Sequence, residues 1–389
     1  MIQINKKKFI SSIVLAAIIG GIVVGGGIMA ALSLKGLSLV SAKEAKEMKG
    51  ILDVFGKFPA IQETVEGKGI FKIDKAKAQD DVYKAYVNAL GDKYSEYLNA
   101  EEAKEWEESL SGEFSGVGVN FREEDGVFVV IKTIEGSPAS KEDIKAGDII
   151  EKVDGKTYSE HIEMAKAIRG EEGSKVTLTL SRDGESKDIT MVRGTVKEKT
   201  VTAAILDDNI GYIRILSFEE GTAKEFKEAV SQLESKGVEK AVIDIRENFG
   251  GYTKEGIDIA DMLLPEGTIT YMKDKKGKKE YFNSDVNRTK LKYSLLVNEN
   301  TASTSEILAA AVKDNKGGPV VGTKTFGKGI VQNTYKFNDG SALKLTIMQY
   351  FSPKGKTIHK KGVKPDYVVE LPENAESDVQ LAKAVELLK

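Results

Sequence analysis

Cysteine is absent from the 389-residue chain, and histidine occurs only twice. The first absence excludes a disulfide framework, a thiol nucleophile and a thiolate metal site. The second leaves His161 and His359 as the only candidates for a histidine base. Neither lies near the turn that presents the serine of histidine-based hydrolases. A hydrolase built from these residues must therefore activate its nucleophile with another group.

A surplus of basic residues is also missing. The chain has 57 Lys and Arg against 60 Asp and Glu, which gives a formal net charge of −3. This balance argues against a nucleic-acid partner, whose recognition needs a basic surface. The sequence has no zinc motif of the His-Glu-x-x-His type either, so we expect no metal and no cofactor.

One long uncharged run is present, and it lies at the N-terminus. Residues 9–34 follow Lys6, Lys7 and Lys8, and the run exceeds the roughly 20 residues needed to cross a bilayer. The positive-inside rule predicts that residues 1–8 form a cytoplasmic tail and that the rest is extracytoplasmic. We favour a retained signal-anchor in the cell membrane over a cleavable signal peptide, whose apolar core spans only about 7–15 residues. Cleavage would instead give a secreted protein.

The remainder divides by pattern, and its length suggests two to four folding units. Residues 42–111 predict a charged helical region, with a helix start where Glu102 follows Asn99 by three. Residues 112–194 consist of short β-rich runs and turns, including a predicted strand over 117–121. Residues 195–367 alternate strands and helices, and residues 368–389 predict a C-terminal helical segment. The fold class read from the residues alone is mixed α/β.

Ser303 lies where the buried strand 293–297 leads into the helix that begins near Glu306. Ser303 and Glu306 also match a helix capping box, so the pattern alone fits a structural role. A serine at a helix N-terminus, however, meets a positive dipole and free N–H groups, notably that of Thr304. We therefore take Ser303 as the candidate nucleophile, with Ser305 as the alternative.

Lys328 stands between two glycines, 25 residues after Ser303. At a reference pKa of about 10.4, roughly one lysine in 2,500 is neutral at pH 7, so a lysine base needs a pKa near 7–8. A shift of about three units corresponds to roughly 4 kcal/mol, which burial against apolar neighbours supplies. Phe326 and Ile330 are the predicted neighbours. Gln332, an even number of residues further on, would share a strand face with Lys328.

These segments resemble the signature of the C-terminal processing peptidases, also called tail-specific proteases, which use a serine–lysine dyad. Residues 301–306 (Thr-Ala-Ser-Thr-Ser-Glu), residues 326–332 (Phe-Gly-Lys-Gly-Ile-Val-Gln) and residues 244–251 (Asp-Ile-Arg-Glu-Asn-Phe-Gly-Gly) carry the resemblance. Thr304 departs from it, because a smaller residue is usual there.

The resemblance implies a ClpP/crotonase-like protease core with an inserted PDZ domain. It implies that Gln332 positions Lys328, and that Gly250 or Gly251 supplies an oxyanion-hole N–H beside that of Thr304. The β-rich segment resembles a PDZ domain, which would bind a substrate's C-terminal carboxylate through the loop of Ser115, Gly116, Val117, Gly118 and Val119. The resemblance also implies that the substrates are proteins with exposed apolar C-termini and that the chain forms a homodimer.

The sequence offers two other interpretations. Ser341-Ala-Leu-Lys344 matches the Ser-x-x-Lys of penicillin-recognising enzymes, but it lies in a predicted strand and its partner motifs are missing. The second is a catalytically inactive, membrane-tethered PDZ scaffold on a degenerate hydrolase fold. The joint presence of Ser303, Lys328 and Gln332 argues against that scaffold.

Overall fold

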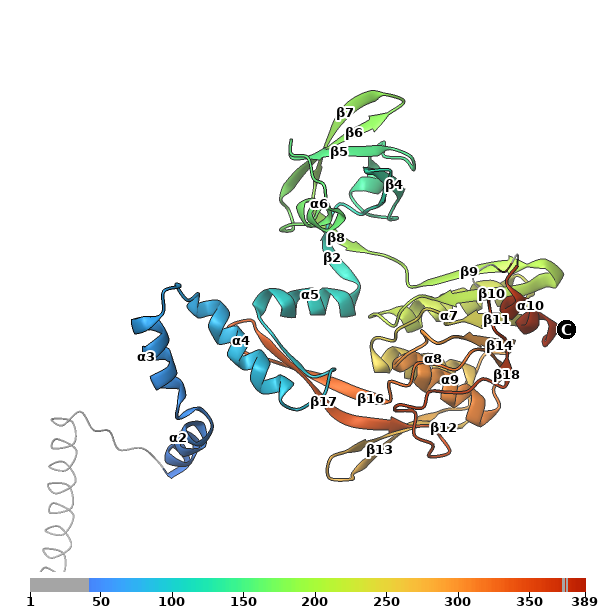
Figure 1. Cartoon of the computed structure of the whole chain (residues 1–389). Helices are drawn as coiled ribbons and strands as arrows, with labels where there is room; N and C mark the ends of the chain where they lie inside the picture. The colour runs from blue at the N-terminus through green and yellow to red at the C-terminus, as the bar shows by residue number, and fades with distance from the viewer. Residues whose placement is uncertain (1–41, 373–374, 376) are drawn as a thin grey trace, which may run out of the picture. The chain divides into compact units, whose positions relative to one another are not determined.

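The computed structural model describes residues 42–372, 375 and 377–389 (Figure 1). The predicted basic tail, residues 1–8, and the predicted anchor, residues 9–34, lie outside this range. Within the described ranges, no helix combines the length and apolarity needed to cross a bilayer. The described residues divide into two units after Gln79.

The first unit confirms the helical prediction for its part of the chain. It contains α2 (Ala42–Phe55), α3 (Phe58–Lys68) and the start of α4 (Lys75–Asn88). Pro59 stands at the start of α3, where its missing N–H costs no helical hydrogen bond. None of the residues of α3 is buried. Short helices with so little burial draw little stability from packing within this unit.

In the second unit, residues 117–193 form a module around a five-stranded antiparallel sheet of order β3-β4-β5-β6-β7. Its strands and helices are β3 (Val119–Glu124), β4 (Val127–Thr133), η1 (Ala139–Lys141), β5 (Ile149–Val153), α6 (His161–Ile168), β6 (Lys175–Arg182) and β7 (Glu185–Val192). Fully buried Val117, Met164, Val176 and Leu178 lie in its core. The module has its own core because strands with one apolar face must bury that face.

The module is joined to the rest by a two-stranded stem. β2 (Glu113–Gly116) pairs antiparallel with β8 (Gly194–Lys197). The predicted continuous strand over 117–121 is wrong, because the chain breaks at Gly118 before β3 begins. Gly118 has φ +77°, and a Cβ there would lie 2.3 Å from Ser137 Cβ. The bend needs glycine both for its backbone angle and for this close approach.

The main sheet is six-stranded, with order β18-β15-β14-β11-β10-β9. All neighbours are parallel except β9 and β10. Its strands are β9 (Val201–Leu206), β10 (Ile210–Ile215), β11 (Lys240–Asp244), β14 (Lys292–Val297), β15 (Val320–Gly322) and β18 (Tyr367–Val368), with η2 (Asp207–Asn209) between the first two. Near-continuous apolar runs such as residues 241–245 suit a sheet covered on both faces.

Helices cover the two faces of this sheet unequally. Ile243 and Leu295 point to the large core shared with α7 (Thr222–Ser235), α8 (Thr253–Leu263) and α9 (Thr304–Asn315). The alternate residues Val242 and Leu296 point to a smaller core covered by α10 (Val379–Glu386). This alternation along β11 and β14 follows from the period of two in a strand.

A second sheet borders the core and includes a hairpin. β16 (Ile330–Lys336) pairs antiparallel with β17 (Ala342–Phe351). β17 also pairs with β1 (Glu96–Leu98) and β12 (Gly267–Asp274), and β12 pairs with β13 (Lys279–Ser284). After β1, Asn99 and Glu102 cap α5 (Ala100–Ser111) reciprocally, at 3.0 and 2.9 Å, as the sequence predicts.

Candidate active site

Ser303 occupies a sharp turn between β14 and α9. Its backbone has φ 59° and ψ −119°, in a region that non-glycine residues rarely adopt. The turn is held on its N-terminal side by Thr301, whose Oγ1 donates to the carbonyl of Ile245 at 2.9 Å. A strained serine at a helix N-terminus matches the strand-to-helix turns that expose nucleophiles in other hydrolases.

The alternative serine has a different environment. Ser305 has no exposed surface, and its Oγ lies 2.9 Å from both the carbonyl oxygen and Oδ1 of Asn248. Ser303 lines the pocket described below, whereas Ser305 does not. The geometry therefore favours Ser303 over Ser305 as the serine that a substrate can reach.

Glu306 joins the turn of Ser303 to the loop of Lys328. This buried carboxylate accepts the N–H groups of Ser303 at 3.0 Å and Lys328 at 2.7 Å, both through Oε2. Its Oε1 accepts the N–H of Gly327 at 2.7 Å and the hydroxyl of Thr325 at 2.6 Å. Burial raises the pKa of Glu306, and these four donors oppose that rise. The carboxylate thus fixes two loops to each other.

The Lys328 side chain is half-buried, and its Nζ lies 4.8 Å from the ring centroid of Tyr94. Burial lowers the pKa of Lys328, and the nearby charge of Lys344 lowers it further. Of the two predicted apolar neighbours, Ile330 lines the pocket with Lys328, whereas Phe326 is 52% exposed and does not line it. In the part of the chain that the structure describes, no hydrogen bond joins Lys328 Nζ to Ser303 Oγ.

Gln332 lies in the same pocket as Lys328 but not for the reason given by strand alternation. β16 begins only at Ile330, and its register shifts between Val331 and Gln332. Lys328 therefore precedes the strand, and the shared-face argument is wrong. Gln332 Nε2 donates to Thr346 Oγ1 on β17 at 3.1 Å, which holds the amide at the pocket wall.

Gly250 approaches Ser303 closely, and Gly251 lines the same pocket. A Cβ at Gly250 would lie 2.8 Å from Ser303 Cβ and 3.1 Å from the backbone nitrogen of Thr304. The N–H of Gly250 donates to Asn248 Oδ1 at 2.9 Å. Among the described hydrogen bonds, the N–H groups of Gly251 and Thr304 have no acceptor. The free N–H donors are therefore those of Thr304, which follows Ser303 directly, and of Gly251 in the same pocket.

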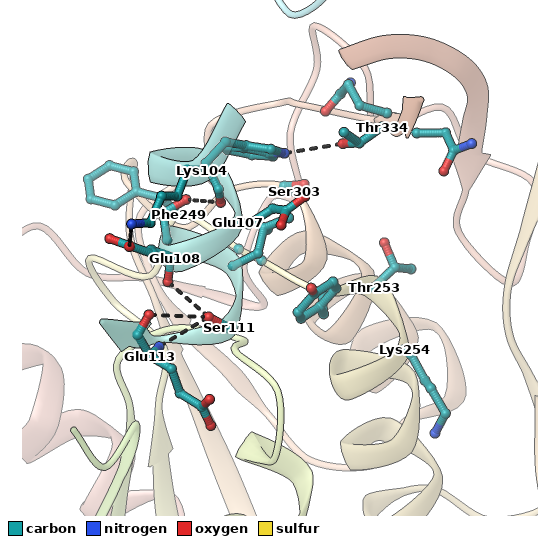
Figure 2. Close-up of a pocket in the computed structure, with 18 of the residues that line it drawn as sticks. Lys104, Glu107, Glu108, Ser111, Glu113, Phe249, Thr253, Lys254, Ser303 and Thr334 are labelled. Carbon is teal, nitrogen blue, oxygen red and sulfur yellow. Dashed lines mark hydrogen bonds and ion pairs between the residues drawn. The ribbon is translucent and has the colours of Figure 1, made fainter. Parts of the chain in front are cut away.

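A pocket of about 1040 Å³ connects these groups. Figure 2 shows α5, with Lys104, Glu107, Glu108 and Ser111, on one side of Ser303, and Thr253 and Lys254 on another. The predicted site residues that line it are Ser303, Lys328, Gln332, Gly250, Gly251 and Ser115. Sequence reasoning missed Tyr94 and Tyr350, because no local motif marks residues that reach a site through tertiary packing. Asn248 lies within the 244–251 motif, but the motif alone did not indicate its contacts with Gly250 and Ser305.

The remaining residues of the predicted carboxylate loop lie in the module. Gly116 ends β2, and Val119 begins β3, which stands at the end of its sheet. Between them, the carbonyls of Val117 and Gly118 accept N–H groups of Ala139 and Ile134, both at 2.8 Å. His161, the first residue of α6, approaches β3: its imidazole Nε2 lies 3.3 Å from the carbonyl oxygen of Phe121.

Comparison with known proteins agrees with this geometry. Residues 209–369 match the model of peptidase family S41, and residues 115–192 match a PDZ domain. The carboxy-terminal processing protease CtpA of Bacillus subtilis is 38% identical over 82% of this chain and 70% of its own length. A "Probable CtpA-like serine protease" of Staphylococcus aureus is 37% identical over 77% of this chain and 62% of its own.

A solved structure supports the same assignment. The photosystem II D1 C-terminal processing protease superposes with a TM-score of 0.51 at 27% identity, over 90% of this chain and 98% of that one. Residues 209–369, which match the family model, include the turn of Ser303, the loop of Lys328 and the glycine pair. The chain therefore belongs to peptidase family S41, the carboxy-terminal processing proteases, and is a serine-type peptidase that carries a PDZ domain.

Proposed function

We propose that this chain is a membrane-anchored, extracytoplasmic endopeptidase that cleaves proteins through a dyad of Ser303 and Lys328. The observation that carries the proposal is that both residues line one pocket while Glu306 binds the backbone N–H of each. The lowered pKa of Lys328 supports the role of a neutral amine base.

In this mechanism Lys328 Nζ takes the proton of Ser303 Oγ as that oxygen attacks the peptide carbonyl. The developing oxyanion accepts hydrogen bonds from the N–H groups of Thr304 and Gly251, and Gly250 leaves room for it. Protonated Lys328 then gives its proton to the leaving amine, and water hydrolyses the acyl-enzyme. Gln332 orients the amine from the pocket wall.

Lys328 must turn before it can act, because its Nζ lies over the ring of Tyr94 rather than at Ser303 Oγ. Catalytic hydrogen bonds are often absent in a free enzyme and form when substrate binds. A substrate that displaces water from the pocket would destabilise the charged form of Lys328 further and favour rotation of its side chain toward Ser303.

Substrate choice is assigned to the PDZ domain. The outer edge of β3, at the end of its sheet, offers backbone groups to a peptide that adds as a further strand. The loop of residues 115–119 would then hold the C-terminal carboxylate of the peptide. An apolar side chain at the last position of that peptide would pack toward the hydrophobic core of the module. The inactive-scaffold alternative has no support from the relatives, which are named as proteases.

For the wider organisation we propose the arrangement expected from the sequence. We propose the boundaries 42–111 for the helical region, 112–194 for the PDZ domain, 195–367 for the core and 368–389 for the last segment. Residues 9–34 would anchor the chain in the cell membrane, with catalysis on the outer side. The apolar side chains exposed on the N-terminal helices, such as Ile51 and Val54, suit contact with a second copy in a homodimer.

Hydrolysis of fluorescein-labelled casein tests the dyad. We expect S303A and K328A to abolish release of labelled fragments, whereas K324A, which removes an exposed lysine of the same loop, retains the wild-type rate. Undiminished cleavage by S303A or K328A would exclude the dyad.

A peptide with an amidated C-terminus should be cleaved more slowly than its free-acid form if the carboxylate loop acts as proposed.

A further inference from the structure

The backbones of Ser303 and Lys328 are joined twice, once through their N–H groups and once through their carbonyl groups. On the N–H side, Oε2 of Glu306 accepts both N–H groups, at 3.0 and 2.7 Å. On the carbonyl side, the hydroxyl of Tyr350 shares its one proton between two acceptors, the carbonyl oxygen of Ser303 at 2.8 Å and that of Lys328. Glu306 Oε2 thus joins the two N–H groups, and the hydroxyl oxygen of Tyr350 joins the two carbonyl groups.

Tyr350 is placed for this role by β17. Its N–H donates to the carbonyl of Gly329 at 3.1 Å, so the strand binds the lysine loop through its backbone as well. The side chain is 1% exposed, and its ring packs in the main core. Burial raises the pKa of its hydroxyl, which therefore remains a protonated donor at neutral pH.

We propose that Tyr350 and Glu306 form a double clamp that sets the separation of Ser303 and Lys328, with Tyr350 as a positioning residue of the peptidase site. The proposal rests on the dyad proposed above. It differs from a packing role because both contacts are made by the hydroxyl, and because both acceptors belong to the residues that exchange the proton.

The clamp has a second consequence for Ser303. Conformations such as φ 59°, ψ −119° cost of order 1–3 kcal/mol and persist only where the surroundings hold them. The carbonyl of Ser303 also accepts the N–H groups of Glu306 and Ile307 at 2.8 and 3.2 Å. Loss of the Tyr350 hydroxyl removes the bond between this carbonyl and the lysine loop, so the separation of Ser303 and Lys328 is set by the Glu306 half of the clamp alone.

Replacement of Tyr350 by phenylalanine tests the clamp, because Y350F keeps the buried ring and removes only the hydroxyl. The matched control is Y293F. Tyr293 is also buried in the main core, and its hydroxyl donates to one backbone carbonyl, that of Leu263, at 3.3 Å. E306Q removes the charge from the other half of the clamp and gives a second, independent variant.

Three readouts are compared in the full-length enzyme: casein hydrolysis, the rate of labelling by a fluorophosphonate probe that acylates an activated serine, and the pH profile of kcat/KM. We expect Y350F and E306Q to lose about 10- to 100-fold in kcat and in labelling rate, the range that a misplacement near 1 Å produces. KM should stay within about twofold. The acidic limb should move to higher pH, because separated loops admit water to Lys328.

Y293F should keep the wild-type kcat and pH profile while losing thermal stability to a similar extent as Y350F. The clamp is overturned if Y350F keeps the wild-type kcat and pH profile, or if Y293F loses as much activity as Y350F. These outcomes differ from failure of the dyad itself, which would show as full activity of S303A and would overturn both proposals.

Discussion

At the scale of single residues, the site depends on the balance of two effects on the Lys328 amine. Burial disfavours the ammonium form and lowers the pKa. The ring of Tyr94, 4.8 Å from Nζ, favours the ammonium form by about 0.5–2 kcal/mol. Burial and the charge of Lys344 lower the pKa of Lys328, whereas the aromatic face acts in the opposite direction. Tyr94 therefore reduces the fraction of Lys328 that is neutral.

A substitution at Tyr94 separates these effects. Y94L keeps an apolar neighbour but removes the aromatic face that favours the ammonium form, so the pKa of Lys328 should fall further. The base is active when neutral, so the acidic limb of kcat/KM should move to lower pH. As a control, Y367L removes the ring beneath Lys383, 5.7 Å from its Nζ, and should leave the profile unchanged. A shift to higher pH in Y94L would contradict this account.

Gly250 gives a second prediction at this scale. In G250A the new Cβ would lie 2.8 Å from Ser303 Cβ, closer than side chains approach, and at φ +103°. We expect kcat to fall at least about 100-fold, since even a 1 Å displacement of reacting groups costs that much. G237A, at φ +75° with open space around it, separates backbone strain from crowding. It should lose about 1 kcal/mol of stability with kcat intact.

The limits of sequence reasoning also appear at this scale. Ser303 and Lys328 stand in local motifs, so their chemistry was predictable, as was the Asn99 cap of α5. Tyr350 lies 47 residues after Ser303 and reaches it only because β17 pairs with the strand that follows Lys328. Tyr94 arrives through the pairing of β1 with β17. Contacts made by sheet pairing leave no local pattern in the sequence.

At the scale of elements, α10 is tied to the loop that carries the active-site glycines. Asp378 caps α10 by accepting the N–H of Leu381 at 2.9 Å, and its Oδ2 pairs with Arg246 at 2.8 Å. Arg246 also binds the fully buried Asp244 at the end of β11. Burial opposes the charge of Asp378, but the hydrogen bonds from Arg246 and Leu381 outweigh it and lower its pKa.

Loss of this charge should destabilise the fold in a pH-dependent way. D378N should cost about 1–2 kcal/mol of unfolding free energy at pH 7, the sum of a weakened cap and a partly exposed ion pair. A carboxylate with a lowered folded pKa stabilises above its unfolded pKa and loses that contribution as pH falls through the folded value. The difference between D378N and wild type in guanidinium titrations should therefore shrink in acid.

The control for this measurement lies in the same helix. E386Q breaks the exposed pair of Lys383 and Glu386 and should change stability by less than about 0.5 kcal/mol. If E386Q and D378N lose equal stability, or if the D378N difference grows in acid, the ion pair with Arg246 does not hold α10.

At the scale of the whole molecule, the PDZ domain is an insertion with adjacent ends. Glu113 pairs with Lys197 and Gly116 with Gly194, so the chain leaves and re-enters the core through one stem. A deletion of residues 112–194 with a short linker therefore preserves the connectivity of the core. Ser115, which lines the catalytic pocket, would be removed with the domain.

If the domain biases the peptidase site as well as binding tails, this deletion should change kcat on a short internal peptide that has no tail to bind. A pure tether predicts an unchanged kcat and a raised KM for proteins with free C-termini. Steady-state kinetics on both substrates distinguish the two. An unchanged kcat on the short peptide would restrict the domain to substrate capture.

The central claim, that Lys328 activates Ser303, is tested most directly by fluorophosphonate labelling followed by mass spectrometry of the labelled peptide. We predict a single adduct on Ser303, formed at a rate that rises with pH through the lowered pKa of Lys328 and that is lost in K328A. An adduct on Ser305, or labelling of Ser303 at the wild-type rate in K328A, would contradict the claim.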